Sequence, residues 1–204
     1  MIFQRFKDCY CHINIFDHAK HLNQYLDLGI NVYSNKSVVN KFGGEKYNFK
    51  AVEPLKTFQV GSFKVMFFPA QHDVETYGML IEHAECGKIL FATDTYYIKY
   101  KFKGLNNLIL ETNYSKEIIN RKVSEQGISS FLKDRVLRSH FSLENAIQFL
   151  NENDLSQVNT INLIHLSSSN SNAVEFQQKV TEATGKLVTV LEKGLSVDFN
   201  KNPF

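Results

Sequence analysis

Polar and apolar residues alternate in the middle of the chain in the way that β-hairpins require. The segment TFQVGSFKVMFF, residues 57–68, alternates on both sides of Gly61 and Ser62, which indicates a tight turn. The segments YGMLIEH and KILFATD flank AECG and predict a second hairpin. Its returning strand is almost wholly apolar, which is typical of a strand buried on both faces. NNLILETN, residues 106–113, predicts another buried strand.

Helical spacing alternates with strands in the rest of the chain. Asp17 is a good N-cap for HAKHLNQYLDL, with apolar positions at 22, 25 and 26, and Gly29 ends that helix before the short strand INVYS. Ser142 caps SLENAIQFLNEN, which has apolar residues at 143, 146, 147 and 150. The strands TINLIHLS and KLVTVLEKG enclose the helix SNAVEFQQKVTEATG. We therefore predict an α/β protein with two sheets that helices cover on the outside.

Composition narrows the class of protein. The 204 residues suffice for one domain, residues 1–204, and 43% apolar with 22% charged residues is ordinary for a folded chain. A net charge of +2 gives no strong attraction to nucleic acid or to an anionic membrane. The chain has neither an apolar run long enough to cross a bilayer nor a signal peptide at its start. Three cysteines fit a reducing compartment, so we expect a cytoplasmic protein.

Residues capable of chemistry follow the apolar segments. His72, Asp94 and His165 each follow or end an apolar strand, and Asp17 with His18 begins a helix. Strand ends and helix starts are where α/β proteins gather their sites, and imidazole with carboxylate suits zinc and similar divalent ions. Each residue also has a simpler interpretation as a helix cap, a turn residue or an exposed histidine. Their occurrence together favours a metal site.

These segments together resemble the metallo-β-lactamase superfamily. The motifs DH, QHD, ATDT and LIHLS match its metal-binding motifs in order and approximate spacing. Further segments, including GMLIEHAECGKILFATDTYY and LRSHFSLENAIQFL, are most similar to the anti-Pycsar cyclic-nucleotide phosphodiesterases of phages. The similarity covers roughly residues 17–198. It implies a metallo-β-lactamase-like αββα sandwich, here expected to lack the first strands, because only sixteen residues precede Asp17.

The resemblance also implies a ligand set and its chemistry. The metal ligands would be Asp17, His18, His72, Asp94 and His165, holding Zn²⁺ or Mn²⁺ in a two-metal hydrolytic site. Asp17 would also act in catalysis. His140, in SHFS, would contact phosphate or protonate the leaving group, or else be an ordinary loop histidine. Glu111 and Asn113, in LETNY, would lie near the metal ligands and orient them without binding the metal.

The opening stretch HINIFDHAKHL departs from the family pattern. The positions two and four residues before Asp17 are Ile15 and Ile13, where the family has histidines. His12 is one residue out of register, so it would reach the site only through a bulge, and His21 is interpreted as a surface histidine. One metal site therefore keeps four candidate ligands, and its neighbour keeps only His72 and the shared Asp94. We expect one ion per chain, where the family has two.

The expected function follows from this resemblance. It is hydrolysis of cyclic nucleotides of the cCMP or cUMP type against the host's Pycsar defence, in the host cytoplasm if the gene is phage-borne, with activity impaired in this chain. The implied partners are the cyclic nucleotide and a second copy of the chain in a homodimer, with no membrane. The alternatives are an RNase Z-like or other nuclease, which the small net charge disfavours, and an inactive fragment or nucleotide-binding decoy.

Overall fold

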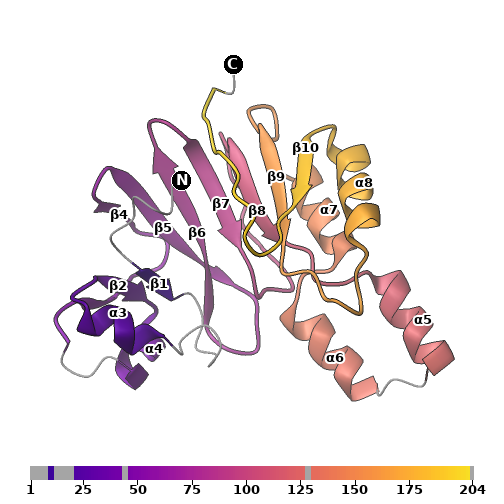
Figure 1. Cartoon of the computed structure of the whole chain (residues 1–204), viewed down its shortest axis with the longest axis horizontal. Coiled ribbons are helices and arrows are strands. Elements are labelled where there is room, and N and C mark those ends of the chain that lie inside the picture. The colour runs from indigo at the N-terminus through magenta and orange to yellow at the C-terminus, as the bar shows by residue number, and fades with distance from the viewer. Residues whose placement is uncertain (1–8, 12–20, 43–45, 127–129, 203–204) are drawn as a thin grey trace.

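Two sheets and two sets of helices form four layers, separated by three hydrophobic clusters. The computed structural model describes residues 9–11, 21–42, 46–126 and 130–202 (Figure 1). One cluster lies between the large sheet and its outer helices, a second between the two sheets, and a third between the small sheet and its own helices. This is the αββα sandwich that was predicted.

The large sheet supplies most of the core and carries the candidate site at one edge. Its strand order is β10-β9-β8-β7-β6-β5-β4. The strands from β4 to β7 are antiparallel, and those from β7 to β10 are parallel. The bounds are β4 Thr57–Val60, β5 Phe63–Ala70, β6 Thr76–His83, β7 Gly87–Ala92, β8 Asn107–Glu111, β9 Thr160–Ile164 and β10 Leu187–Val190.

The small sheet has the order β1-β2-β3, with both pairings parallel. Its strands are β1 Cys9–Cys11, β2 Val32–Ser34 and β3 Phe49–Ala51. Val32 packs with the helices α3 Leu22–Asp27 and α4 Lys36–Phe42, while the next residue, Tyr33, packs into the cluster between the sheets. This alternation is the strand period of two. The predicted strand INVYS corresponds to β2, the middle strand of this sheet.

Helices α7 Leu143–Asn151 and α8 Ala173–Thr184 cover the outer face of the large sheet (Figure 1). Their buried side chains belong to the cluster that contains the strand residues Leu90, Leu108 and Leu163. Helices α5 Lys116–Gln126 and α6 Ser130–Ser139 form a hairpin that projects beyond the end of the sheet. That hairpin connects β8 to α7, so both of its ends lie at the candidate site.

The structure confirms the predicted hairpins and the two later helices. Gly61 turns the first hairpin with φ +58°, and the side chain of Ser142 caps α7 by accepting from the backbone of Asn145. Helix α3 begins at Leu22, and Asp17 lies outside the described residues. The helices α4, α5 and α6 and the strands β1 and β3 were not predicted. In the described part of the chain, no helix combines the length and apolarity that crossing a membrane requires.

Candidate metal centre

Four side chains from separate segments converge at one edge of the large sheet. Asp94, Glu111, His140 and His165 each place a potential ligand atom within 4.8 Å of the others. Asp94 and His165 follow β7 and β9, and Glu111 is the last residue of β8 between them. Parallel pairing of these three strands places their carboxyl ends side by side, which brings the three side chains together. His140 arrives from the end of α6.

The backbone at two of these residues is unusual. Asp94 has φ +50° and His165 has φ +58°, and Leu55 is the only other non-glycine residue with positive φ in the described part of the chain. Left-handed backbone at such residues costs on the order of 1–2 kcal/mol and is concentrated at functional sites. The tertiary structure thus holds both residues in a backbone conformation that non-glycine residues disfavour.

Glu111 is the centre of the hydrogen-bonding pattern. Its Oε1 lies 2.7 Å from Nδ1 of His140 and 2.8 Å from Nδ1 of His165. The Oδ1 of Asp94 lies 3.8 Å and 3.6 Å from the same two nitrogens. The Glu111 side chain is fully buried and that of Asp94 is 3% exposed, whereas the side chains of His140 and His165 are 24% and 39% exposed. The two carboxylates are therefore buried, and the two imidazoles are partly exposed to solvent.

Thr95 fastens three segments of the site to one another. Its backbone N–H donates to Oε2 of Glu111 at 3.2 Å. Its Oγ1 accepts a hydrogen bond from the backbone N–H of Gln71 at 3.0 Å, and Gln71 directly precedes His72 in the chain. The backbone N–H of Tyr96 donates to the carbonyl oxygen of Gln71 at 2.9 Å. The end of β5 is thereby tied to the turn that carries Asp94.

Asn113 supports the other side of the site, as its predicted role requires. Its Nδ2 donates to the carbonyl oxygen of His165 at 2.7 Å. Its backbone N–H donates to the carbonyl oxygen of Phe141 at 2.8 Å, and its own carbonyl oxygen accepts from Ser167 at 2.9 Å. One residue therefore connects the segments of His140 and His165. The bond to His165 also holds the carbonyl group of a residue in the left-handed conformation.

His72 approaches the group from β5. Its ring centroid lies 6.2 Å from that of His140, and its side chain is 3% exposed. Burial lowers the pKa of His72, and the carboxylate of Asp73 opposes that shift only in part. The predicted ligands Asp17 and His18, together with His12, lie outside the described residues. His21 is exposed, in agreement with its interpretation as a surface histidine.

The donor set at this edge fits a divalent metal ion. Two carboxylates and two imidazoles are the ligands that Zn²⁺, Mn²⁺ and Fe²⁺ accept. Asp94 and Glu111 are both buried, and two neighbouring buried carboxylates repel each other unless a proton or a cation lies between them. The strained backbone and the supports from Thr95 and Asn113 are what a preorganised metal site requires.

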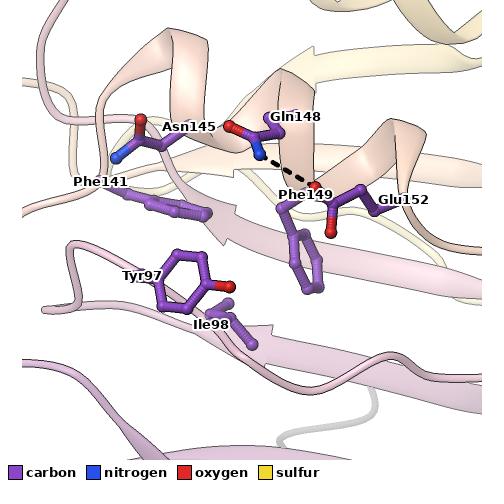
Figure 2. A pocket seen from close by; sticks show the side chains of 7 residues that line it. All are labelled: Tyr97, Ile98, Phe141, Asn145, Gln148, Phe149 and Glu152. Carbon is purple, nitrogen blue, oxygen red and sulfur yellow. Dashed lines mark hydrogen bonds between the residues drawn. The ribbon is translucent and has the colours of Figure 1, made fainter.

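A small pocket adjoins this site but is lined by different residues. Figure 2 shows it between helix α7 and the segment that follows β7. Phe141, directly after His140, lines it together with Tyr97, Ile98, Asn145, Gln148, Phe149 and Glu152. Gln148 donates to Glu152 across its rim at 2.9 Å. The candidate ligands do not line this pocket, so chemistry is expected at the sheet edge instead.

The sequence patterns understated the importance of two residues. Glu111 was expected to lie behind the site, yet its carboxylate is part of the group itself. The signal was present, because Glu111 ends a buried strand just as Asp94 and His165 follow theirs. Thr95 was not singled out, and its role depends on contacts with β5 and β8 that no local pattern reveals.

Comparisons with known proteins identify the fold. No family model matches the chain, and no curated protein matches it by sequence. Among solved structures, the metallo-β-lactamase fold protein YhfI from Bacillus subtilis matches with a TM-score of 0.67 and 14% identity, over 92% of this chain and 76% of that one. Igni18, a metallo hydrolase from the archaeon Ignicoccus hospitalis, also gives 0.67 and 14%, over 95% and 80% of the chains.

A third structure of this kind is the short form of human tRNase Z. It matches with a TM-score of 0.55 and 14% identity, over 95% of this chain and 79% of that one. At such identities the similarity shows the fold and does not decide the activity. The chain has the metallo-β-lactamase fold, as the sequence motifs predicted.

Proposed function

We propose that this chain is a metal-dependent hydrolase that cleaves the phosphodiester of a cyclic nucleotide. The observation that carries the proposal is the convergence of Asp94, Glu111, His140 and His165 at the carboxyl edge of the sheet. The fold supports it, because one protein with the same fold is described as a metallo hydrolase. The choice of a cyclic nucleotide rests on the sequence resemblance alone.

Asp94 and His165 would hold the metal, with Glu111 and His140 beside them and His72 at the margin. Asp17 and His18 complete the ligand set that the sequence motifs predict. Zn²⁺ or Mn²⁺ bound there would make a water acidic enough to attack at neutral pH and would neutralise charge on the phosphate. The buried carboxylates attract the cation, while the more exposed imidazoles remain accessible to the substrate.

His140 is the residue best placed to move a proton. Its Nδ1 lies 2.7 Å from the buried carboxylate of Glu111, and this hydrogen bond orients the ring. The other ring nitrogen can then donate a proton to the ribose oxygen that leaves the phosphate. Glu111 acts here through His140, in the way that a carboxylate orients a catalytic histidine.

The substrate, the oligomeric state, the metal content and the level of activity are proposed from the resemblance. The substrate would be cCMP or cUMP, and the chain would remove this signal of the host's Pycsar defence. A homodimer would close the active site, and the chain would retain one metal ion. Activity would be weak, because Ile13 and Ile15 stand where related proteins have histidines.

The test is metal content together with turnover. Elemental analysis of the purified chain should give about one transition-metal ion per chain. Cyclic CMP and cyclic UMP should be hydrolysed to mononucleotides, and a chelator should abolish that reaction until metal is added back. The variant Glu82→Gln, on the exposed side of β6, serves as a control for purification and folding.

Other outcomes would select the alternatives. Cleavage of single-stranded or precursor RNA without cyclic-nucleotide turnover would favour the nuclease. Tight nucleotide binding without turnover would favour the decoy. A chain that retains no transition metal and has no hydrolytic activity would refute the proposal.

A further inference from the structure

The loop between β5 and β6 carries His72, whose ring centroid lies 6.2 Å from that of His140. We propose that Asp73 and Glu75 are positioning residues that hold His72 with its Nε2 available to a metal ion. This inference rests on the proposed function, because it assumes that a metal binds at the sheet edge. Neither residue belongs to the ligand set that the sequence motifs predict.

Asp73 acts on the imidazole directly. Its Oδ1 lies 2.5 Å from Nδ1 of His72, so the negative charge of the carboxylate is next to this ring nitrogen and favours a proton on it. A neutral histidine with its proton on Nδ1 has its lone pair on Nε2. Metal-binding histidines commonly have a carboxylate or carbonyl beside their second ring nitrogen, which fixes the tautomer and leaves the other nitrogen for the metal.

A competing contact explains why the carboxylate matters. The backbone N–H of Val74 points at the same Nδ1 from 3.3 Å. That contact favours the opposite tautomer, in which the proton on Nε2 prevents this nitrogen from binding a metal. The charge of the Asp73 carboxylate opposes this preference from 2.5 Å, so removal of the carboxylate should reverse the tautomer.

Glu75 anchors the far end of the loop to the small sheet. Its carboxylate accepts from the hydroxyl of Ser37, at the start of α4, and from the hydroxyl of Tyr77 at 2.8 Å. Its carbonyl oxygen accepts from Nδ2 of Asn35 at 2.9 Å, and the Asn35 side chain also caps α4 through Val38.

The other end of the loop is tied to Thr95 through Gln71. Both ends of the segment that carries His72 are therefore fixed, one to each sheet. A carboxylate as exposed as that of Glu75 contributes little to stability on its own. Its three partners nevertheless set the position of the loop relative to the site.

The first test measures the tautomer without any metal. Ring ¹⁵N chemical shifts of the full chain, stripped of metal by a chelator, should show His72 protonated on Nδ1. In Asp73→Ala the signal should move towards the form protonated on Nε2, and in Glu82→Ala it should not move. The His72 signals are assigned by their loss in His72→Gln. An unchanged tautomer in Asp73→Ala would overturn the inference.

The second test measures Zn²⁺ affinity by competition with a chelator. Asp73→Ala and Glu75→Ala should each weaken binding about tenfold, the usual effect of losing a residue that orients a ligand. Glu75→Gln should restore affinity, because its amide can still bond to Ser37 and Tyr77. In the His72→Ala background neither alanine substitution should have a further effect, since both are argued to act through His72.

The outcomes separate this inference from the proposed function. Equal losses with and without His72 would mean a general structural role and would overturn the positioning argument, while leaving the metal site in place. Failure of the unsubstituted chain to bind Zn²⁺ would instead refute the proposed function, whatever the tautomer of His72.

Discussion

Asp94 and His165 follow two strands that are not neighbours, yet Oδ1 of one lies 3.6 Å from Nδ1 of the other. Strand β8 separates β7 from β9, and both residues have a positive φ, +50° for Asp94 and +58° for His165. Glu111, at the end of β8, places its Oε1 2.8 Å from Nδ1 of His165. The geometry of the site therefore depends on two strained residues that converge over a buried carboxylate.

We expect Asp94→Ala to reduce metal binding more than any other single substitution. The family resemblance implies that Asp94 contacts both metal positions, so its loss would remove a ligand from each. Alanine also tolerates positive φ poorly, so the free energy of unfolding should fall by about 1–2 kcal/mol. Asp94→Asn, which adopts this backbone more readily, should lose the metal with less destabilisation. A larger loss of metal in His72→Ala, measured by elemental analysis, would show that the bridging assignment is wrong.

Glu111→Gln should weaken metal binding and turnover by about 10- to 100-fold. The substitution keeps the shape of the side chain but removes the charge that both His140 and His165 face at Oε1. Glu82→Gln, exposed on β6, provides the matched control and should have no effect. The measurement is Zn²⁺ affinity by chelator competition, and an affinity equal to that of the control would contradict the role of Glu111.

Asn113→Ala should destabilise the chain by about 1–3 kcal/mol and lower its metal affinity. It removes the 2.7 Å bond to the carbonyl oxygen of His165 and leaves that acceptor without this donor. Asn151→Ala, at the exposed end of α7, is the control. Urea unfolding gives the stability, and titration with Co²⁺ reports the ligand field. A Co²⁺ spectrum identical to that of the control would mean that Asn113 does not position His165.

Acid should destabilise the metal-free chain through His72. Burial holds the pKa of this residue below its ordinary value of 6.5, so the unfolded chain binds a proton more readily than the folded one. The stabilising contribution is complete above pH 6.5 and is lost as the pH falls from there through the folded-state pKa. Between pH 7.5 and pH 5 the Tm of His72→Gln should fall less than the Tm of the parent chain. An equal fall of Tm in the two chains would contradict the argument.

Gly78→Ala should destabilise the large sheet by about 1–3 kcal/mol through overpacking. Gly78 lies opposite Phe68 in the register of β5 and β6, and an added Cβ would lie 2.2 Å from the ring of that fully buried residue. Far-UV circular dichroism during thermal unfolding measures the change. A Tm equal to that of the parent would show that the Phe68 ring can move aside.

Local sequence patterns predicted the helices and hairpins that depend only on neighbouring residues. Alternation around Gly61 predicted the first hairpin, and Ser142 with its apolar spacing predicted α7, because a turn or a cap involves only neighbouring residues. The ends of apolar strands pointed to Asp94 and His165 for the same reason. The helices α5 and α6 were not predicted, since polar and charged residues outnumber apolar ones in both.

The tertiary structure alone decided which side chains meet. The parallel register of β7, β8 and β9 brings Glu111 between Asp94 and His165, and the return of the chain after α6 adds His140. Residues 94 and 165 are 71 positions apart, and only strand pairing brings their ends to one edge. The positive φ at both residues and the contact between Asp73 and His72 are likewise invisible in a pattern of polar and apolar letters. Such features arise from packing, in which distant segments impose a conformation that the local sequence does not prefer.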